Sequence, residues 1–219
     1  EKPRDNWQMK MEFSGVPSSS RLVLALDDLS VGYGEKVILE HLEAALTYGE
    51  HAVLIGANGC GKSTLLRTIA GRLPVLAGRV KLGPSVRVGY MAQEQEGLLP
   101  TLTVLQTIQR VASMNETAAR TYLHRFLFSG DEAFLPVAQC SFGMRSRLAL
   151  ACLVAQGCNF LLLDEPLNHL DLPSRNQFER ALAGFEGTIL AVAHDRYFIQ
   201  SFATRIWEIK EGRLQSSEA

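Results

Sequence analysis

The chain reads Gly56-Ala57-Asn58-Gly59-Cys60-Gly61-Lys62-Ser63-Thr64 directly after an apolar segment, His51–Ile55. The apolar segment is typical of a strand, and the spacing of apolar residues from Gly61 to Ala70 predicts a helix. The residues between them fit the pattern G-x-x-x-x-G-K-[ST], in which glycines let the backbone curl so that successive N–H groups point inward. The start of the helix adds unpaired N–H donors and a partial positive charge. The sequence therefore predicts a strand, a loop that binds phosphate groups, and a helix.

The side chains of this loop suit a nucleoside triphosphate. The Lys62 ammonium can reach the β- and γ-phosphates as a point charge, and the Ser63 hydroxyl can bind Mg²⁺. The remaining loop residues contribute mainly backbone N–H groups. The predicted nucleotide-binding residues of the loop are Gly56, Asn58, Gly59, Cys60, Gly61, Lys62, Ser63 and Thr64.

A second signal is the continuous apolar run Phe160–Leu163, which ends at Asp164 and Glu165. Such a run is typical of a strand buried on both faces of a parallel sheet. Ligands of open α/β sheets bind at the carboxyl ends of the strands, so we expect both acids to lie near the phosphates. Asp164 would hold Mg²⁺, directly or through water. Glu165 would accept a proton from the attacking water or orient it.

Composition excludes several classes of protein. Among 219 residues, 22 are Lys or Arg and 23 are Asp or Glu, so the net charge of −1 gives no sign of attraction to nucleic acid or to an anionic membrane. The cysteines lack paired spacing, which excludes zinc and disulfide scaffolds and predicts free thiols in a reducing compartment. They are Cys60, Cys140, Cys152 and Cys158.

The sequence gives no membrane or secretory signal. The longest apolar run, Leu148–Ala155, falls well short of the roughly 20 residues that cross a bilayer. The charged start of the chain is followed by no apolar stretch of a signal peptide. We therefore expect a cytoplasmic protein.

Strands that alternate with helices predict an α/β fold with a mostly parallel sheet. Short strands at 22–26, 37–39 and 51–55, with close turns between them, suggest an antiparallel edge sheet. The stretch at about 97–158 carries helical spacing only and predicts an inserted helical lobe. Residues 1–20 are polar and rich in loop formers, so we expect a linker remnant there and one domain over 21–219. The other expected elements are strands at 79–82, 86–90, 160–163, 188–193 and 205–210 and helices within 102–128 and at 142–155 and 174–182.

Taken together, residues 21–219 resemble the nucleotide-binding domain of ATP-binding cassette (ABC) proteins, whose further motifs follow in the family's order. Gln93 follows Val88–Ala92, His194 ends the apolar strand Thr188–Ala193, and Tyr33 lies in an early turn. The resemblance implies a P-loop NTPase core with a mostly parallel sheet, an N-terminal antiparallel β subdomain and an inserted α-helical subdomain. It also implies ATP as the nucleotide, Mg²⁺ as the cofactor, and hydrolysis to ADP and phosphate.

The resemblance assigns roles to these residues. Gln93 would sense Mg²⁺ and the γ-phosphate, His194 would contact the γ-phosphate, and Tyr33 would stack on adenine. The implied catalytic residues are Glu165, His194 and Gln93, and the implied metal ligands are Ser63, Gln93 and Asp164.

The family's signature, commonly Leu-Ser-Gly-Gly-Gln, is altered to Cys140-Ser141-Phe142-Gly143-Met144. Ser141 can cap the following helix and donate its hydroxyl to a phosphate, and Gly143 lets the backbone approach closely. Both would complete the site of a partner cassette. The changed flanking positions favour weaker binding or turnover at that half-site.

Two strings narrow the resemblance to the ABC-F subfamily. Residues 164–171 are similar to DEPTNHLD with Leu167 in place of Thr, and residues 194–198 read HDRYF. ABC-F proteins carry two cassettes in one chain without a transmembrane domain and typically act on the ribosome, as translation factors or in antibiotic resistance. Residues 10–13, followed by a Ser-rich turn, resemble the exit of their interdomain linker, so the chain resembles the C-terminal cassette.

The implied function is an ATP-driven dimerisation switch on the ribosome, with a second cassette as the partner, in the same parent chain or as a homodimer. Two alternatives stay open. The chain could be the energy-coupling ATPase subunit of an ABC membrane transporter, with a membrane subunit as its partner. It could also be a nucleotide-gated binding module with negligible catalysis, which Phe142 and Met144 motivate and Glu165 opposes.

Overall fold

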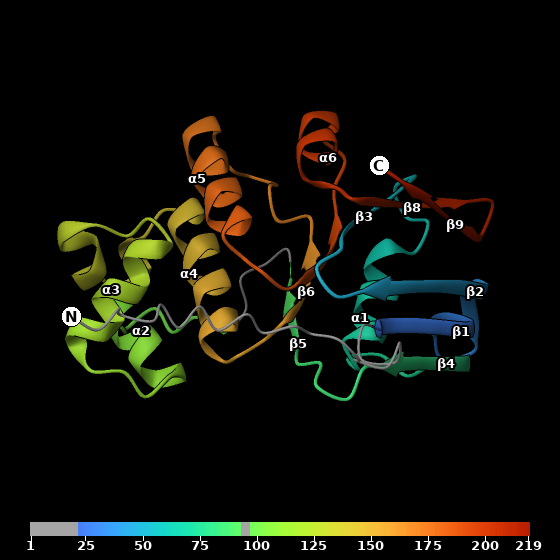
Figure 1. Ribbon diagram of the computed structural model, residues 1–219, viewed down its shortest axis with the longest axis horizontal. Helices are drawn as coiled ribbons and strands as arrows, with labels where there is room; N and C mark the ends of the chain where they lie inside the picture. The colour runs from blue at the N-terminus through green and yellow to red at the C-terminus, as the bar shows by residue number, and fades with distance from the viewer. Residues whose placement is uncertain (1–21, 93–96) are drawn as a thin grey trace, which may run out of the picture.

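The computed structural model describes residues 22–92 and 97–219. The expected linker at 1–20 and the candidate residue Gln93 lie outside these ranges. The described chain is an α/β fold with one mixed, mostly parallel sheet and one antiparallel sheet (Figure 1).

The larger sheet has six strands and carries the carboxyl ends that the sequence singles out. Its strands are parallel except for the last pair, in which β9 runs antiparallel to β8. In spatial order they are β5 (Val88–Met91), β6 (Phe160–Asp164), β7 (Thr188–Val192), β3 (His51–Gly56), β8 (Arg205–Lys210) and β9 (Arg213–Glu218).

The smaller sheet is antiparallel, with the order β2 (Lys36–Thr47), β1 (Leu22–Tyr33), β4 (Ala77–Leu82). The predicted grouping of 51–55 with these edge strands is wrong. That segment is β3, which lies between β7 and β8 and pairs with both in parallel. The physical reason is burial: Ala52, Val53 and Leu54 are fully buried, as in a central strand covered on both faces.

Helices connect these strands. They are α1 (Lys62–Ile69), α2 (Val104–Val111), α3 (Glu116–Arg125), α4 (Phe142–Ala155), α5 (Leu172–Ala183) and α6 (Arg196–Phe202), with 3-10 turns at Gly130–Phe134 and Val137–Gln139. The helical spacing at 102–128 corresponds to α2 and α3. The stretch is divided into two helices, and α3 begins after Asn115 because the Asn115 side chain accepts the N–H of Ala118 at 2.8 Å and caps this helix.

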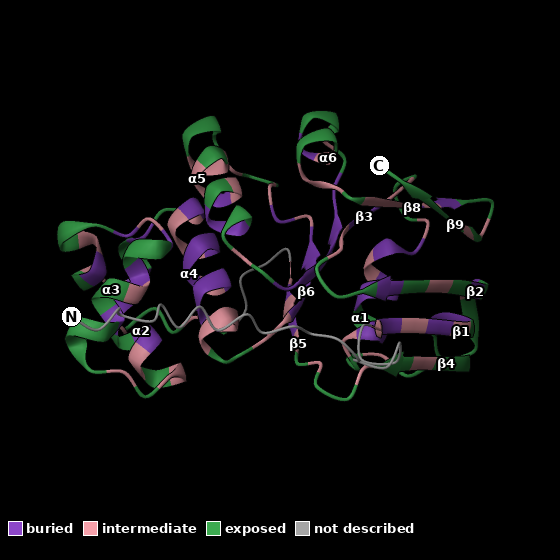
Figure 2. Cartoon of the chain, in the orientation of Figure 1, coloured by how far each residue is buried: buried purple, intermediate pink, exposed green. Residues whose placement is uncertain are grey.

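The main sheet separates two hydrophobic cores. Leu161 and Leu163 of β6 pack in one cluster with residues of α2, α3, α4 and α5. Phe160 and Leu162, which point to the opposite face, pack with α1 and the antiparallel sheet. Figure 1 shows the same arrangement, with α2 and α3 at one end of the molecule and the antiparallel sheet at the other. In Figure 2 strand β6 and much of α4 are purple, that is, buried. The run at 160–163 is therefore buried on both faces, as predicted.

Within residues 22–92 and 97–219, no helix combines the length and the apolar character needed to cross a bilayer.

Candidate active site

The loop that joins β3 to α1 depends on glycine for its shape. Gly61 precedes α1 with φ of 104°, a left-handed conformation that other residues rarely adopt. A Cβ atom at this position would lie 2.8 Å from Cγ2 of Ile38. At Gly56 a Cβ atom would lie 2.9 Å from the sulfur of Cys60 and 3.0 Å from the Ile209 carbonyl oxygen. The glycines therefore let the loop turn tightly over the end of the sheet.

Lys62 lies under this loop and not in solvent. The residue is 5% exposed, and its Nζ donates to the carbonyl oxygens of Gly56 at 2.9 Å and Ala57 at 2.8 Å. A buried ammonium requires such partners because desolvation is costly. The Lys62 ammonium is thus held inside the loop by two carbonyl oxygens. An anionic ligand in the loop could replace these oxygens as hydrogen-bond acceptors of the ammonium.

A cavity of about 750 Å³ opens at the loop. Its volume is within the usual range of about 300–1,000 Å³ for small-molecule sites. Asn168 and Ile38 contribute to its wall although neither was predicted. The predicted residues that line it are Tyr33, Asn58, Gly59, Gly61, Lys62, Ser63, Thr64, Glu165 and His194. The structure therefore brings the phosphate loop, one of the two acids and the histidine to one place.

Ser63, which lines this cavity, contacts the buried Asp164. The Ser63 hydroxyl donates to Oδ1 of Asp164 at 2.9 Å, and Asp164 is 3% exposed. Burial raises the pKa of Asp164, while hydrogen bonds from Ser63 and Tyr90 act in the opposite direction. A hydroxyl and a carboxylate oxygen side by side are the hard ligands that Mg²⁺ prefers, so this pair fits the implied metal.

Tyr90 is a neighbour of this pair that the sequence reasoning missed. Its hydroxyl donates to Oδ2 of Asp164 at 3.2 Å. Its position follows from strand register, which the sequence does not show: Tyr90 on β5 pairs with Leu162 on β6, two residues before Asp164 on the same face.

Glu165 and His194 lie side by side in the lining of the cavity. Oε1 of Glu165 lies 3.5 Å from Nε2 of His194, and Oε2 accepts a hydrogen bond from the Asn168 side chain. The Glu165 backbone has φ of 51°, and its N–H donates to the carbonyl of Val192 at 3.2 Å. Asn168 is not among the predicted site residues, because the string at 164–171 is a signal of family resemblance and does not reveal a contact with Glu165.

The other candidate residues lie at the rim or beyond it. Tyr33 is 46% exposed, and its hydroxyl accepts from Thr64 at 3.4 Å. Ser141 caps α4 by accepting the Met144 N–H at 3.1 Å, and like Gly143 it does not line the cavity. Gly143 is buried against α5, where a Cβ atom would lie 2.5 Å from the Ser174 side chain.

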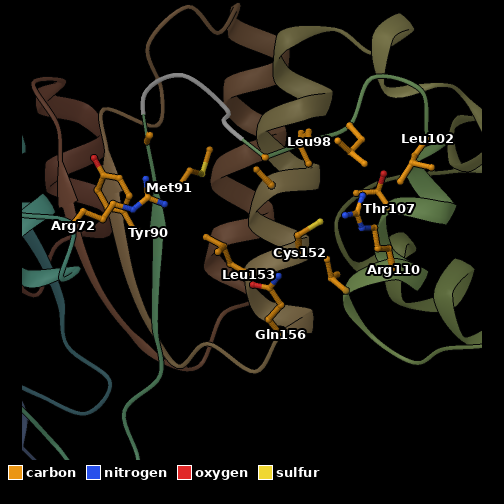
Figure 3. A pocket seen from close by; sticks show the side chains of 15 residues that line it. Arg72, Tyr90, Met91, Leu98, Leu102, Thr107, Arg110, Cys152, Leu153 and Gln156 are labelled. Atoms are coloured by element: carbon orange, nitrogen blue, oxygen red, sulfur yellow. The ribbon is translucent and has the colours of Figure 1, made fainter.

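A second cavity of about 540 Å³ lies between β5, α2 and α4. Figure 3 shows Tyr90 and Arg72 side by side at its β5 end, and Thr107 and Arg110 on α2 at its far end. The guanidinium carbon of Arg72 lies 4.5 Å from the centroid of the Tyr90 ring. Tyr90 thus forms part of the wall of this cavity while its hydroxyl reaches Asp164.

A glycine-rich loop joins the parallel strand β3 to a helix, and its serine lies beside an acid at the end of β6, which β7 separates from β3. This arrangement defines a P-loop nucleoside triphosphatase fold. Comparison with known families narrows this class, since the family model described as ABC transporter matches residues 39–168. The chain belongs to this family and is an ABC-F-like nucleotide-binding domain.

Relatives over nearly the whole chain agree with this assignment. YdiF of Bacillus subtilis, whose name describes it as ATP-binding, is 42% identical over 213 residues, covering 96% of this chain and 33% of YdiF. YheS of Escherichia coli, also described as ATP-binding, is 36% identical over 208 residues, with 94% and 33% covered. ABC transporter F family member 5 of Arabidopsis thaliana is 35% identical over 218 residues, with 98% and 32% covered. The chain thus spans about a third of the length of these relatives.

Proposed function

We propose that this domain binds ATP with Mg²⁺ and hydrolyses it to ADP and phosphate in the cytoplasm. The observation that carries the proposal is the convergence of two segments at one cavity. Lys62 and Ser63 come from the phosphate loop, and Ser63 donates to Asp164 at 2.9 Å, next to Glu165 in the cavity wall.

Phosphate binding follows from the loop. Its backbone N–H groups and the start of α1 supply donors for the phosphate oxygens. The Lys62 ammonium, bound in this structure to the carbonyls of Gly56 and Ala57, would move onto the β- and γ-phosphates. Tyr33, which is half exposed at the rim, would offer its ring to the adenine.

Ser63 and Asp164 would hold Mg²⁺, and Gln93 is proposed as a further ligand by resemblance. When bound, the ion neutralises charge on the β- and γ-phosphate oxygens. The chain's own contribution is a pair of oxygen ligands, one of them 3% exposed, at the carboxyl end of β6.

Glu165 is the proposed general base. Water attacks the γ-phosphorus, its proton passes to the Glu165 carboxylate, and the bond from the γ-phosphorus to the ADP oxygen breaks. Asn168 holds one carboxylate oxygen of Glu165 and therefore orients the base. His194, 3.5 Å from the other oxygen, is proposed to contact the γ-phosphate.

A second cassette would complete each site. Ser141 and Gly143 lie at the start of α4, away from the chain's own cavity, and are proposed to contact ATP bound by that partner. The curated relatives are about three times as long as this chain, which leaves room for another cassette in a parent chain. Hydrolysis removes the γ-phosphate that joins the two halves, so ATP drives a two-state switch. The ribosome is the proposed site of action, on the basis of the ABC-F resemblance.

The proposal is tested by steady-state ATPase measurements on wild-type protein and Glu165→Gln over a range of protein concentrations. We expect slow turnover at low concentration, a rate per chain that rises with concentration, and loss of hydrolysis in Glu165→Gln with nucleotide binding retained. Glu186→Gln, which changes an exposed carboxylate outside the cavity, is the matched control. Rapid hydrolysis that is independent of concentration would refute the shared site, and full activity of Glu165→Gln would refute the assigned base.

A further inference from the structure

The Tyr90 side chain contacts Asp164 through its hydroxyl and two arginines, Arg67 of α1 at the hydroxyl and Arg72 of the turn after α1 at the ring. It donates to Oδ2 of Asp164 at 3.2 Å, and Nε of Arg67 donates to it at 3.5 Å. The Arg72 guanidinium covers the face of the Tyr90 ring, as Figure 3 shows. Three segments of the chain therefore fix this one side chain.

These partners set the direction of the hydroxyl hydrogen. A guanidinium has donors and no acceptor, so the Tyr90 oxygen accepts from Arg67 and its own hydrogen is left for a different partner. The Asp164 carboxylate is that partner. The hydroxyl is thus an oriented donor aimed at an acid that is 3% exposed.

The two oxygens of Asp164 consequently have separate partners, Ser63 on Oδ1 and Tyr90 on Oδ2. An aspartate carboxylate otherwise turns readily about its terminal bond, because that torsion has broad, two-fold preferences. With Oδ2 fixed by Tyr90, the other oxygen faces Ser63, and the two proposed Mg²⁺ ligands stay side by side.

We propose that Tyr90 is a positioning residue for the magnesium site: its hydroxyl holds the Asp164 carboxylate in the orientation that presents Oδ1 beside Ser63. The inference rests on the proposed function, since it assumes that Ser63 and Asp164 bind Mg²⁺. A purely structural role of the hydroxyl would affect stability and nucleotide binding without regard to the metal. A positioning role of Tyr90 would therefore weaken nucleotide binding in Mg²⁺ more than nucleotide binding without Mg²⁺ when the hydroxyl is removed.

The experiment compares wild type with Tyr90→Phe, which keeps the ring and removes only the hydroxyl. The dissociation constant of a non-hydrolysable ATP analogue is measured by calorimetry in Mg²⁺ and again in EDTA, on the 219-residue chain. Tyr122→Phe is the matched control, because the Tyr122 hydroxyl also makes a hydrogen bond, to the Ala151 carbonyl at 2.8 Å, within the helical lobe. Urea unfolding of each variant shows whether the fold is kept.

We expect Tyr90→Phe to weaken binding in Mg²⁺ by about three- to tenfold, the usual effect of one hydrogen bond, and to leave binding in EDTA within about twofold. Tyr122→Phe should leave both constants unchanged. In an Asp164→Asn background, Tyr90→Phe should add no further loss, since its partner has been changed.

Equal losses in Mg²⁺ and EDTA, or no loss in either, would overturn the positioning role while leaving the proposed function intact. A wild-type chain that binds the analogue equally with and without Mg²⁺ would overturn the metal site and the inference together. A wild-type chain that binds no nucleotide would overturn the proposed function itself. The three failures are therefore distinguishable.

Discussion

Glu165 adopts a left-handed backbone conformation, with φ of 51°, at the residue directly after β6. Such a conformation costs of order 1–3 kcal/mol for a residue other than glycine and persists only where its surroundings impose it. Here the Val192 carbonyl accepts the Glu165 N–H, and Asn168 holds its carboxylate. The turn separates the directions of two adjacent acids, so that Asp164 faces Ser63 while Glu165 lines the cavity.

The ionisation of a second residue, Glu50, makes the stability of the fold depend on pH. Burial opposes its ionisation, but hydrogen bonds from the Thr47 N–H at 2.6 Å and from Arg205 at 2.8 Å outweigh it and hold the pKa of Glu50 below its ordinary value of 4.5. The ionised form therefore favours the fold. This stabilisation is fully present above pH 4.5 and is lost as the pH falls through the pKa of the folded state.

We expect Glu50→Gln to lower the free energy of unfolding by about 1 kcal/mol at pH 7, since charge-assisted hydrogen bonds are the stronger ones. The difference from wild type should shrink as the pH falls below 4.5. Urea unfolding of both proteins from pH 3 to pH 8 measures it. A difference that is constant over this range would show that the charge of Glu50 has no part in the stability.

Single residues were predictable where their type and spacing carry chemistry. Lys62, Ser63, Asp164 and Glu165 could be recognised because a loop and the end of a buried strand restrict what they can do. Tyr90 could not, because an aromatic residue in a short apolar strand looks like core. Its contact with Asp164 depends on the pairing of β5 with β6, which no local pattern reveals.

At the scale of elements, the contact of α4 with α5 assigns a packing role to Gly143. A Cβ atom at Gly143 would lie 2.5 Å from both Cβ and Oγ of Ser174, near the start of α5. The Cβ atom of Ser174 cannot turn away by a change of rotamer, so the helices would have to shift. Gly143 is therefore needed by the chain's own fold, whether or not it also contacts a partner's nucleotide.

We expect Gly143→Ala to lower the free energy of unfolding by about 1–3 kcal/mol, as overpacking in a core does. Adding Ser174→Gly should recover part of this loss, because it removes the atoms that a new Cβ would meet. Urea unfolding of wild type, both single variants and the double variant measures the coupling. Gly143→Ala with wild-type stability, or additive losses in the double variant, would contradict the packing role.

The elements that the sequence missed have weak local signals. Strand β9, Arg213–Glu218, is largely exposed and polar, so it lacks the alternation that predicts a strand, and it forms by pairing with β8. Helix α6 has seven residues, too few for a clear period, and begins where Asp195 accepts the Phe198 N–H at 2.8 Å. The misplacement of β3 has the same origin, since a fully apolar run does not tell which sheet covers it.

At the scale of the whole molecule, the site lies at the carboxyl ends of the strands of the main sheet, and a hydrophobic core packs on each face of this sheet. The carboxyl ends of β3, β6 and β7 carry the phosphate loop, the two acids and His194. The fold class was predictable from the alternation of strands and helices. The arrangement of the strands was not, because segments such as β5 and β6 that are neighbours in the sheet are far apart in sequence.

The central claim is that nucleotide phosphates bind at the loop from Gly56 to Thr64, with Asp164 and Glu165 beside them. A crystal structure of the chain with Mg²⁺ and a non-hydrolysable ATP analogue tests it most directly. We predict phosphate oxygens within hydrogen-bond distance of the loop N–H groups and of Lys62 Nζ, and both carboxylates facing the metal and the γ-phosphate. An analogue bound instead in the cavity between β5, α2 and α4, or phosphates beyond the reach of both acids, would contradict the account.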